Sequence, residues 1–181
     1  FYYYNKSSGY MYISTDGGVN YTQAGYVAKG WQRITASPYK EGELWIPVYG
    51  TNSENGLYHS INSGQSFNKL PNVQEATGVS LGPNLPGKTY PSIYIYGKID
   101  NKWGVYQSDD SAATWFQIND YQHQYGWVDF VVADARKYGR VFLSPNWMGV
   151  PYSELKKDCN GHMDGSAYSD WCGASVVVNT G

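Results

Sequence analysis

The feature that most constrains this chain is a short motif that occurs three times. Each copy reads Ser-x-Asp/Asn-x-Gly/Ala-x-polar-aromatic, and the copies begin at Ser14, Ser60 and Ser108, separated by 46 and then 48 residues. A repeat of this length is typical of a four-stranded blade of a β-propeller. We therefore predict an all-β chain that forms a partial or incomplete β-propeller of about three four-stranded blades.

The repeated motif, an Asp-box, predicts the turn of a β-hairpin. The Asp or Asn side chain is expected to bind nearby backbone N–H groups, and the Gly to adopt a conformation that Cβ atoms disfavour. The closing aromatic ring then anchors the next strand. We interpret Asp16, Asn62 and Asp110 as turn residues rather than a catalytic row, and Ala112, in place of Gly, predicts a strained or differently shaped third turn. The predicted structural residues are Ser14, Asp16, Gly18, Tyr21, Ser60, Asn62, Gly64, Phe67, Ser108, Asp110 and Trp115.

Composition indicates strands and a carbohydrate partner. The chain has 19 Tyr, 7 Trp and 21 Gly but only 15% charged residues, and sugar rings stack their apolar faces on aromatic rings. A net charge of −2 gives no electrostatic reason for binding nucleic acid or an anionic membrane. No apolar run approaches the ~20 residues of a membrane-spanning helix. The chain starts abruptly at Phe1, as a mature or excised fragment would, and we expect a secreted protein.

Two segments are expected. Residues 1–155 form the propeller segment, and residues 156–181 form a tail or cap pinned by a Cys159–Cys172 disulfide, with a metal pair or two free thiols as alternatives. The Asp158–Asp170 stretch faintly resembles a calcium loop, but its spacing is wrong, so we predict no metal and no cofactor. Three blades leave strand edges exposed, which predicts packing against remaining blades in the same protein or another chain.

Several stretches of the sequence, taken in their order along the chain, resemble those of a known family. The most specific is the Asn-Asp-x-Gln-His-Gln-Tyr-Gly run at 119–126, which is followed by Asp134-Ala135-Arg136 and preceded by Gly42-Glu43-Leu44-Trp45. In these residues the chain resembles the last part of the second propeller of glycoside hydrolase family 74, the xyloglucan-specific endoglucanases and related oligoxyloglucan hydrolases. It departs at 144–151, where the family has a Gly-rich run.

The resemblance implies an inverting hydrolase, whose two carboxyl groups lie ~6.5–9.5 Å apart across the scissile bond. It also implies that both catalytic aspartates lie upstream of the matched region, so we predict that this chain alone is not catalytic. The other candidate carboxylates are Asp120, Asp129 and Asp134. Asp129 lies among aromatic residues that would raise its pKa, although an outward-facing strand position also explains it. Asp134 is interpreted as a turn residue.

We therefore expect a cleft-lining or carbohydrate-binding segment of a xyloglucan-degrading system. Gln122 and His123 would bind sugar hydroxyls. Core packing is the alternative for each Trp, and we expect at least half of them to be core. The candidate sugar-stacking rings are Trp31, Trp45, Tyr125, Trp127 and Trp147.

Two other functions are considered, and the small number of blades, the missing catalytic residues and the Cys-bearing tail favour the first of them. One is a non-catalytic module that binds glycan or protein, such as a cohesin-like or scaffoldin unit of an extracellular cellulosome-type assembly, with a secreted hydrolase as partner. The other is a sialidase-like or receptor propeller, which needs an arginine cluster for the substrate carboxylate. Only Arg33, Arg136 and Arg140 are present, so this function ranks last.

Overall fold

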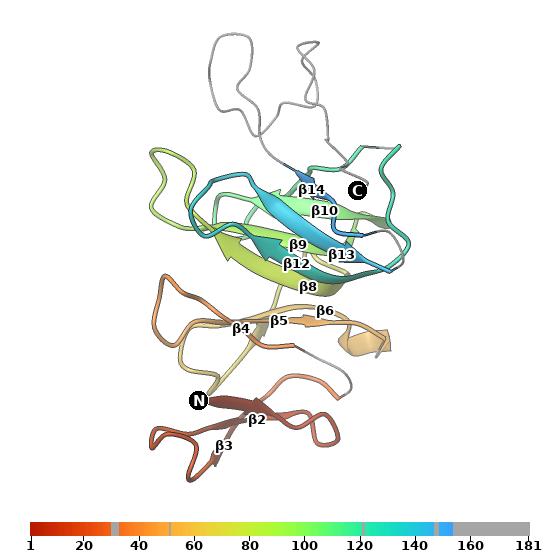
Figure 1. Ribbon diagram of the computed structural model, residues 1–181. Helices are drawn as coiled ribbons and strands as arrows, with labels where there is room; N and C mark the ends of the chain where they lie inside the picture. The colour runs from red at the N-terminus through yellow and green to blue at the C-terminus, as the bar shows by residue number, and fades with distance from the viewer. Residues whose placement is uncertain (30–32, 51, 121, 147–148, 154–181) are drawn as a thin grey trace. The chain divides into compact units, whose positions relative to one another are not determined.

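The computed structural model describes residues 1–29, 33–50, 52–120, 122–146 and 149–153 (Figure 1). Strands dominate these ranges, and their one helical element is the single 3-10 turn η1 (Asn52–Glu54). The prediction of an all-β chain is therefore confirmed. Within the same ranges, no helix is long and apolar enough to cross a membrane.

The strands form four antiparallel sheets, which we name I to IV in chain order. Sheets I and IV have three strands each, and sheets II and III have four. Sheet I contains β1 (Tyr2–Tyr4), β2 (Tyr10–Ile13) and β3 (Thr22–Tyr26); sheet II contains β4 (Thr35–Ala36), β5 (Leu44–Val48), β6 (Gly56–Ser60) and β7 (Asn68–Lys69); sheet III contains β8 (Glu75–Gly82), β9 (Ser92–Ile99), β10 (Lys102–Ser108) and β11 (Phe116–Gln117); sheet IV contains β12 (Val128–Ala133), β13 (Val141–Pro145) and β14 (Tyr152–Ser153).

The three Asp-boxes occupy equivalent positions in sheets I to III. Each box forms the hairpin between the last two strands of its sheet, namely β2–β3, β6–β7 and β10–β11. Sheet I therefore corresponds to the last three strands of sheets II and III. Counting boxes predicts three blades, whereas the structure has a fourth sheet, IV, whose described residues contain no box. The predicted partial propeller thus consists of two complete sheets and two incomplete ones.

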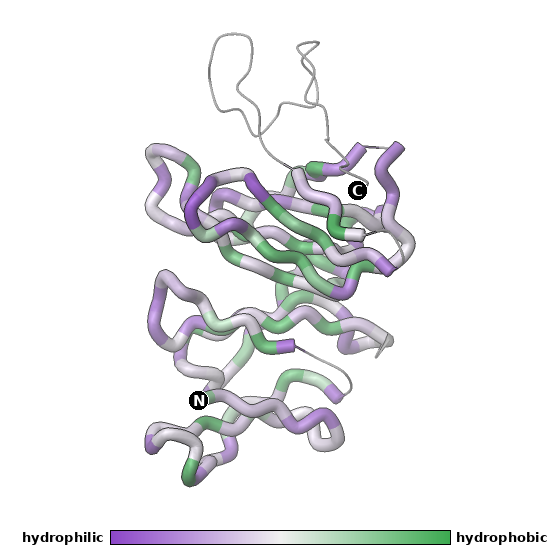
Figure 2. The backbone as a smooth tube through the Cα atoms, viewed as in Figure 1, coloured by the Kyte–Doolittle hydropathy of each residue, from purple (hydrophilic) through white to green (hydrophobic). Residues whose placement is uncertain are grey.

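The chain divides into two compact units, each with its own core. Unit 1 comprises residues 1–77 and 97–102, and unit 2 comprises residues 78–96 and 103–181. Figure 2 shows hydrophobic residues concentrated along the strands and hydrophilic residues in many of the turns. In unit 1 the core cluster is Met11, Val27, Ala28, Leu44, Ile46 and Val48. In unit 2 it is Tyr94, Tyr96, Val105, Ile118, Tyr125, Val128, Val131, Ala133, Val141 and Leu143.

Several predictions fall on residues that the structure does not describe. The predicted cap at 156–181 and the Cys159–Cys172 disulfide lie outside the described residues, as do Trp31 and Trp147. The domain boundary at residue 155 therefore remains a prediction.

Candidate functional site

The first Asp-box turn is closed by its serine and aspartate side chains. Ser14 Oγ donates to Asp16 Oδ1 at 2.7 Å and accepts the backbone N–H of Gly18 at 2.8 Å. Asp16 Oδ1 also accepts the backbone N–H of Asn20 at 3.0 Å. These hydrogen bonds, led by the one from Asn20, hold the pKa of Asp16 well below its usual range. A carboxylate so engaged stays ionised and cannot serve as a general acid at neutral pH.

The other two boxes repeat this geometry. Ser60 bonds Asn62 Oδ1 and the Gly64 N–H at 2.9 Å each, and Ser108 bonds Asp110 Oδ1 at 2.9 Å and the Ala112 N–H at 3.0 Å. In every box the fourth and fifth residues have positive φ. These pairs are Gly17 and Gly18 (80° and 93°), Ser63 and Gly64 (59° and 79°), and Ser111 and Ala112 (60° and 68°).

The closing aromatic residues differ in their environments. Phe67 is partly buried and packs against the core of unit 1. Tyr21 is instead exposed and contacts Tyr3 edge-on, with ring centroids 6.2 Å apart. Trp115 is partly buried. The Asp-boxes are therefore turn devices, and the candidate binding residues lie elsewhere.

The candidate site is the loop from Asn119 to Trp127, which joins sheet III to sheet IV in unit 2. Asn119 anchors this loop, because its Oδ1 accepts the backbone N–H of Val105 at 2.8 Å and its amide donates to the His123 carbonyl oxygen at 2.8 Å. Gly104 makes room for the anchor, since a Cβ there would lie 2.9 Å from Asn119 Oδ1. The anchoring role of Asn119 was not predicted from the sequence, although Asn119 begins the most specific run of the family resemblance.

Asp120 fixes the outer part of the loop. Its Oδ1 accepts the backbone N–H groups of Gln122 at 2.9 Å and His123 at 2.8 Å, and it lies 2.6 Å from His123 Nδ1. Burial alone would raise the pKa of Asp120, but the hydrogen bonds from His123 outweigh it and lower the pKa. With Nδ1 held by a carboxylate, the imidazole presents Nε2 for other partners. Gln122 is exposed and His123 is partly exposed.

Tyr125 and Trp127 continue the loop but differ in exposure. Tyr125 is only 8% exposed and belongs to the core of unit 2, where Tyr96 donates its phenol to the Tyr125 carbonyl oxygen. Trp127 is partly buried and donates its indole N–H to Asp129 Oδ1 at 2.8 Å. Little of the Tyr125 ring is thus available for stacking on a sugar, whereas Trp127 keeps a partly exposed ring in a fixed orientation.

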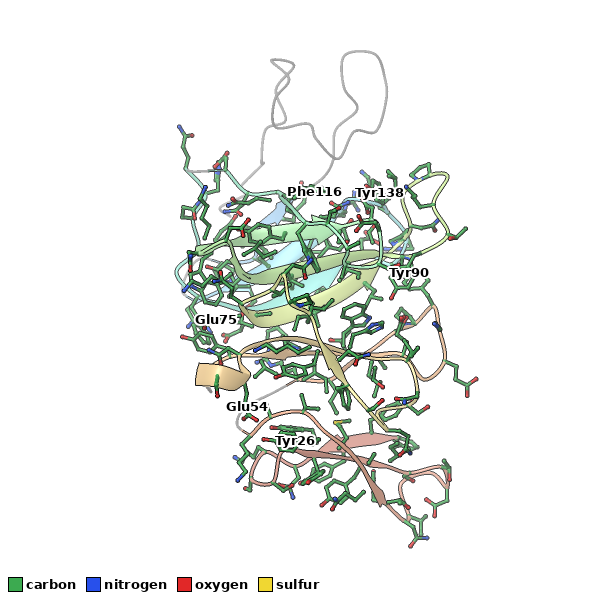
Figure 3. The ribbon with its side chains drawn as sticks, turned by 180° about the vertical axis from the view of Figure 1, so that it is seen from behind. Tyr26, Glu54, Glu75, Tyr90, Phe116 and Tyr138 are labelled. Atoms are coloured by element: carbon green, nitrogen blue, oxygen red, sulfur yellow. The ribbon has the colours of Figure 1, made fainter. Side chains whose placement is uncertain are left out.

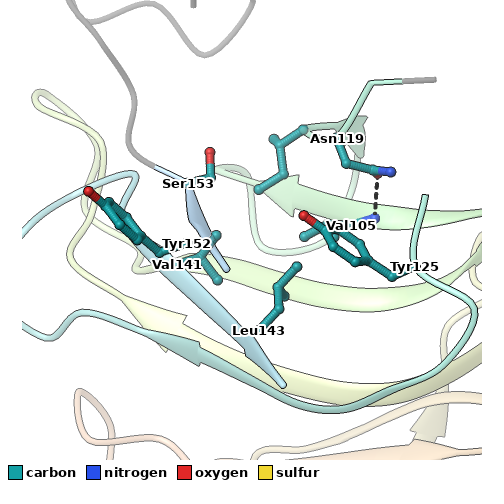
Figure 4. Close-up of a pocket in the computed structure, with 8 residues that line it drawn as sticks. Val105, Asn119, Tyr125, Val141, Leu143, Tyr152 and Ser153 are labelled. Atoms are coloured by element: carbon teal, nitrogen blue, oxygen red, sulfur yellow. Dashed lines mark hydrogen bonds between the residues drawn. The ribbon is translucent and has the colours of Figure 1, made fainter. Parts of the chain in front are cut away.

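Figure 4 shows Asn119 and Tyr125 beside a small, mostly apolar pocket in unit 2. Its apolar walls offer few hydrogen-bonding groups to a sugar. The lining residues are Val105, Ile118, Asn119, Tyr125, Val141, Leu143, Tyr152 and Ser153.

Trp45 lies in the core of unit 1. Its side chain is fully buried and stacks on the His59 ring, with centroids 3.9 Å apart and an interplanar angle of 16°. His59 Nε2 in turn lies 2.9 Å from Oε1 of buried Glu43. Trp45 therefore packs in the core, the alternative that the sequence left open for each tryptophan.

The remaining candidate carboxylates are engaged in local contacts. Asp134 Oδ1 accepts the backbone N–H of Arg136 at 2.8 Å, which is the main reason why its pKa is lowered, and Oδ2 lies 3.2 Å from Arg140 Nη1. Asp134 is thus a turn residue, as the sequence suggested. Asp129 accepts the Trp127 indole. Among the residues that the structure describes, no three His, Cys, Asp or Glu side chains are grouped to hold a metal ion.

Comparison with known proteins gives relatives of one kind. The chain is 43% identical over 159 residues to a xyloglucanase of Acetivibrio thermocellus and 39% identical over 165 residues to a xyloglucanase of a Paenibacillus species. These matches cover 86% and 88% of this chain but only 18% and 16% of the relatives. The chain therefore spans less than a fifth of the length of these curated relatives. No family model matches the chain.

A solved structure has the same fold. A glycoside hydrolase family 74 enzyme of Niastella koreensis superposes with a TM-score of 0.73 at 33% sequence identity. The match covers 82% of this chain and 22% of that enzyme. The resemblance to this family that the sequence indicated is confirmed.

Proposed function

This chain is a segment of a glycoside hydrolase family 74 propeller, and from that relationship we propose that it is a carbohydrate-binding part of a xyloglucan-degrading enzyme. The observation that carries this proposal is the loop fixed by Asn119 and Asp120. The loop holds Gln122 and His123 by hydrogen bonds to Asp120, and Trp127, four residues after His123, carries a partly exposed ring. Pre-organised polar groups beside an aromatic ring are what a site for a neutral sugar requires.

In this proposal the loop supplies binding rather than proton transfer. Asp120 and Asp134 have lowered pKa values, which is the opposite of what a general acid needs at neutral pH. His123 Nε2 exchanges hydrogen bonds with a sugar hydroxyl while Asp120 holds Nδ1. The acid–base pair comes from other parts of the protein, and the protein acts outside the cell, where its polysaccharide substrate occurs.

Sheet I supports the proposal that further blades of the same protein pack against this chain. Tyr12 and Tyr58 both lie two residues before a box serine, and their cross-strand partners are Tyr3 and Ile46. Ile46 is fully buried in unit 1, whereas Tyr3, at the equivalent position, is 52% exposed. The face of sheet I that is equivalent to this buried face of sheet II is therefore aromatic, and it is exposed at Tyr3. An exposed face of this kind fits a neighbouring blade.

Affinity electrophoresis of the full chain through gels containing xyloglucan tests the carbohydrate proposal. Retardation by xyloglucan is expected, and His123→Ala and Asp120→Asn should each reduce it. Gln65→Ala, which changes an exposed side chain in the second box turn, is the control and should migrate like the unmodified protein. Equal migration with and without xyloglucan would contradict the proposal.

A further inference from the structure

A second aromatic ring is held in place on the surface of unit 1. Tyr26 ends β3 and its side chain is 41% exposed. Its phenol donates to Oε1 of Glu54 at 2.6 Å, and Glu54 is the last residue of η1, the turn between β5 and β6. Figure 3 shows Tyr26 and Glu54 on their separate elements of this unit. A surface tyrosine ordinarily samples several rotamers, and this hydrogen bond restricts it to one.

The ring is also fixed by close packing from below. Gly9 has φ of +80°, and a Cβ built there would lie only 2.5 Å from Tyr26 Cε2. The Tyr26 ring therefore rests against the Gly9 backbone, and a side chain larger than that of glycine at position 9 would clash with the ring. Tyr10 contacts it edge-on, with centroids 5.3 Å apart and an interplanar angle of 69°. The ring keeps its orientation while part of its surface faces solvent.

Glu54 is positioned by contacts from several strands. The Tyr58 phenol donates to the Glu54 carbonyl oxygen at 2.9 Å, and Lys69 Nζ donates to the neighbouring Ser53 carbonyl oxygen at 3.2 Å. The Lys29 backbone N–H lies 3.4 Å from Glu54 Oε2. The carboxylate oxygens retain lone pairs beyond these bonds, because each can accept more than one hydrogen.

We propose that Tyr26 and Glu54 form a second carbohydrate-binding site, which takes one pyranose unit of a neutral polysaccharide. The sugar stacks its apolar C–H face on the Tyr26 ring, and a hydroxyl beside that face donates to Glu54. This proposal rests on the carbohydrate function proposed above but concerns a different unit of the chain. A carboxylate at the site disfavours acidic polysaccharides, because two like charges would lie close together.

The test measures affinity for xyloglucan, with polygalacturonate as the acidic comparison, by electrophoresis of the full chain. Tyr26→Ala should weaken xyloglucan binding about tenfold and Tyr26→Phe, which keeps the ring but loses the tie to Glu54, about threefold. Tyr39→Ala is the matched control, since Tyr39 is a similarly exposed tyrosine (44%) of the same unit. It should leave the affinity unchanged, and polygalacturonate should not bind at this site.

Hydroxyl-radical footprinting of the unmodified protein gives a readout that no folding defect can imitate. Xyloglucan oligosaccharide should protect Tyr26 from oxidation and leave Tyr39 unprotected. If Tyr26→Ala binds as Tyr39→Ala does and Tyr26 is not protected, the second site is wrong. If His123→Ala binds xyloglucan more weakly in the same experiment, the function proposed for the 119–127 loop still stands. If the unmodified protein binds no xyloglucan at all, both that function and the second site are wrong.

Discussion

Ser108 Oγ accepts the backbone N–H of Ala112 at 3.0 Å, although Ala112 stands where the first two boxes have glycine. The third turn therefore has the same shape as the other two. In it, Ser111 and Ala112, which both carry a Cβ atom, have φ values of 60° and 68°. Residues other than glycine are strained in this left-handed region. The sequence left open a strained or a differently shaped turn, and the structure has the strained one.

Ser111→Gly should stabilise the chain, because it removes the Cβ from a left-handed position at an exposed residue. The expected gain in the free energy of unfolding is ~0.5–1 kcal/mol. It is the relief of backbone strain in the folded chain minus the cost of the extra conformational freedom that glycine gives to the unfolded chain. Urea denaturation measures it. Ser111→Ala is the control and should give no gain, since it keeps the Cβ; an equal gain would remove backbone strain as the cause.

Gly17→Ala should act in the opposite direction in the first box. Gly17 has φ of +80° and no atom within 4 Å of an added Cβ, so the substitution changes backbone strain without a clash. We expect a loss of ~1 kcal/mol in the free energy of unfolding. Gly126→Ala, which also meets nothing within 4 Å, is the matched control at a position without positive φ. Equal effects of the two would contradict this explanation.

The stability of the chain should fall in acid through the charged boxes. Asp16 and Asp110 have lowered pKa values, Asp16 chiefly through the Asn20 N–H, and Asp110 through its hydrogen bonds with Thr114 and Ser108, which outweigh its burial. A lowered pKa contributes stability above the unfolded value of ~3.9, and this is lost as pH falls through the folded value.

Asn62 forms the same turn without a charge, so Asp16→Asn combined with Asp110→Asn should flatten the acid side of the stability profile. Thermal midpoints measured from neutral pH down to acid give this profile. An acid profile as steep as that of the unmodified chain would show that other carboxylates control it.

The hydrogen bond from Tyr26 to Glu54 should appear in a tyrosine titration. This bond raises the pKa of Tyr26 to about 12. Its contribution to the free energy of unfolding is therefore complete at pH values below the unfolded-state pKa of ~10, and is lost as the pH rises through the folded-state pKa. In Glu54→Gln, we therefore expect Tyr26 to ionise at a lower pH. Followed by ultraviolet difference spectroscopy, the part of the tyrosine signal that titrates at the highest pH should become smaller. An unchanged titration curve would mean that Glu54 does not control Tyr26.

Tyr138→Phe should destabilise unit 2. The buried Tyr138 phenol donates to Asp109 Oδ2 at 2.9 Å and lies 2.8 Å from Gln107 Nε2, and burial together with Asp109 raises its pKa strongly. Removing the hydroxyl leaves partly buried polar groups with fewer partners, which costs about 1–3 kcal/mol. Tyr152→Phe is the control. Chemical denaturation that gives equal stabilities for the two variants would contradict the role of this network.

The sequence predicted what depends on local chemistry. Box serines, aspartates and positive-φ glycines act through neighbours within four residues, so their spacing alone predicted the hairpins. The burial of Trp45 depends on His59, fourteen residues away on another strand, and the anchoring of the loop by Asn119 depends on the backbone of Val105 in β10. Tyr26 and Glu54 meet only because two sheets pack together, which no local pattern records.

The three boxes are equivalent corners of successive sheets, and amide hydrogen exchange at Gly18, Gly64 and Ala112, measured by NMR, examines this equivalence. We expect all three amides to be protected. Replacing Ser14, Ser60 or Ser108 by Ala should remove protection only at the amide that this serine accepts. Three amides that exchange freely, or that do not respond to their own serine, would contradict the shared geometry on which this fold is built.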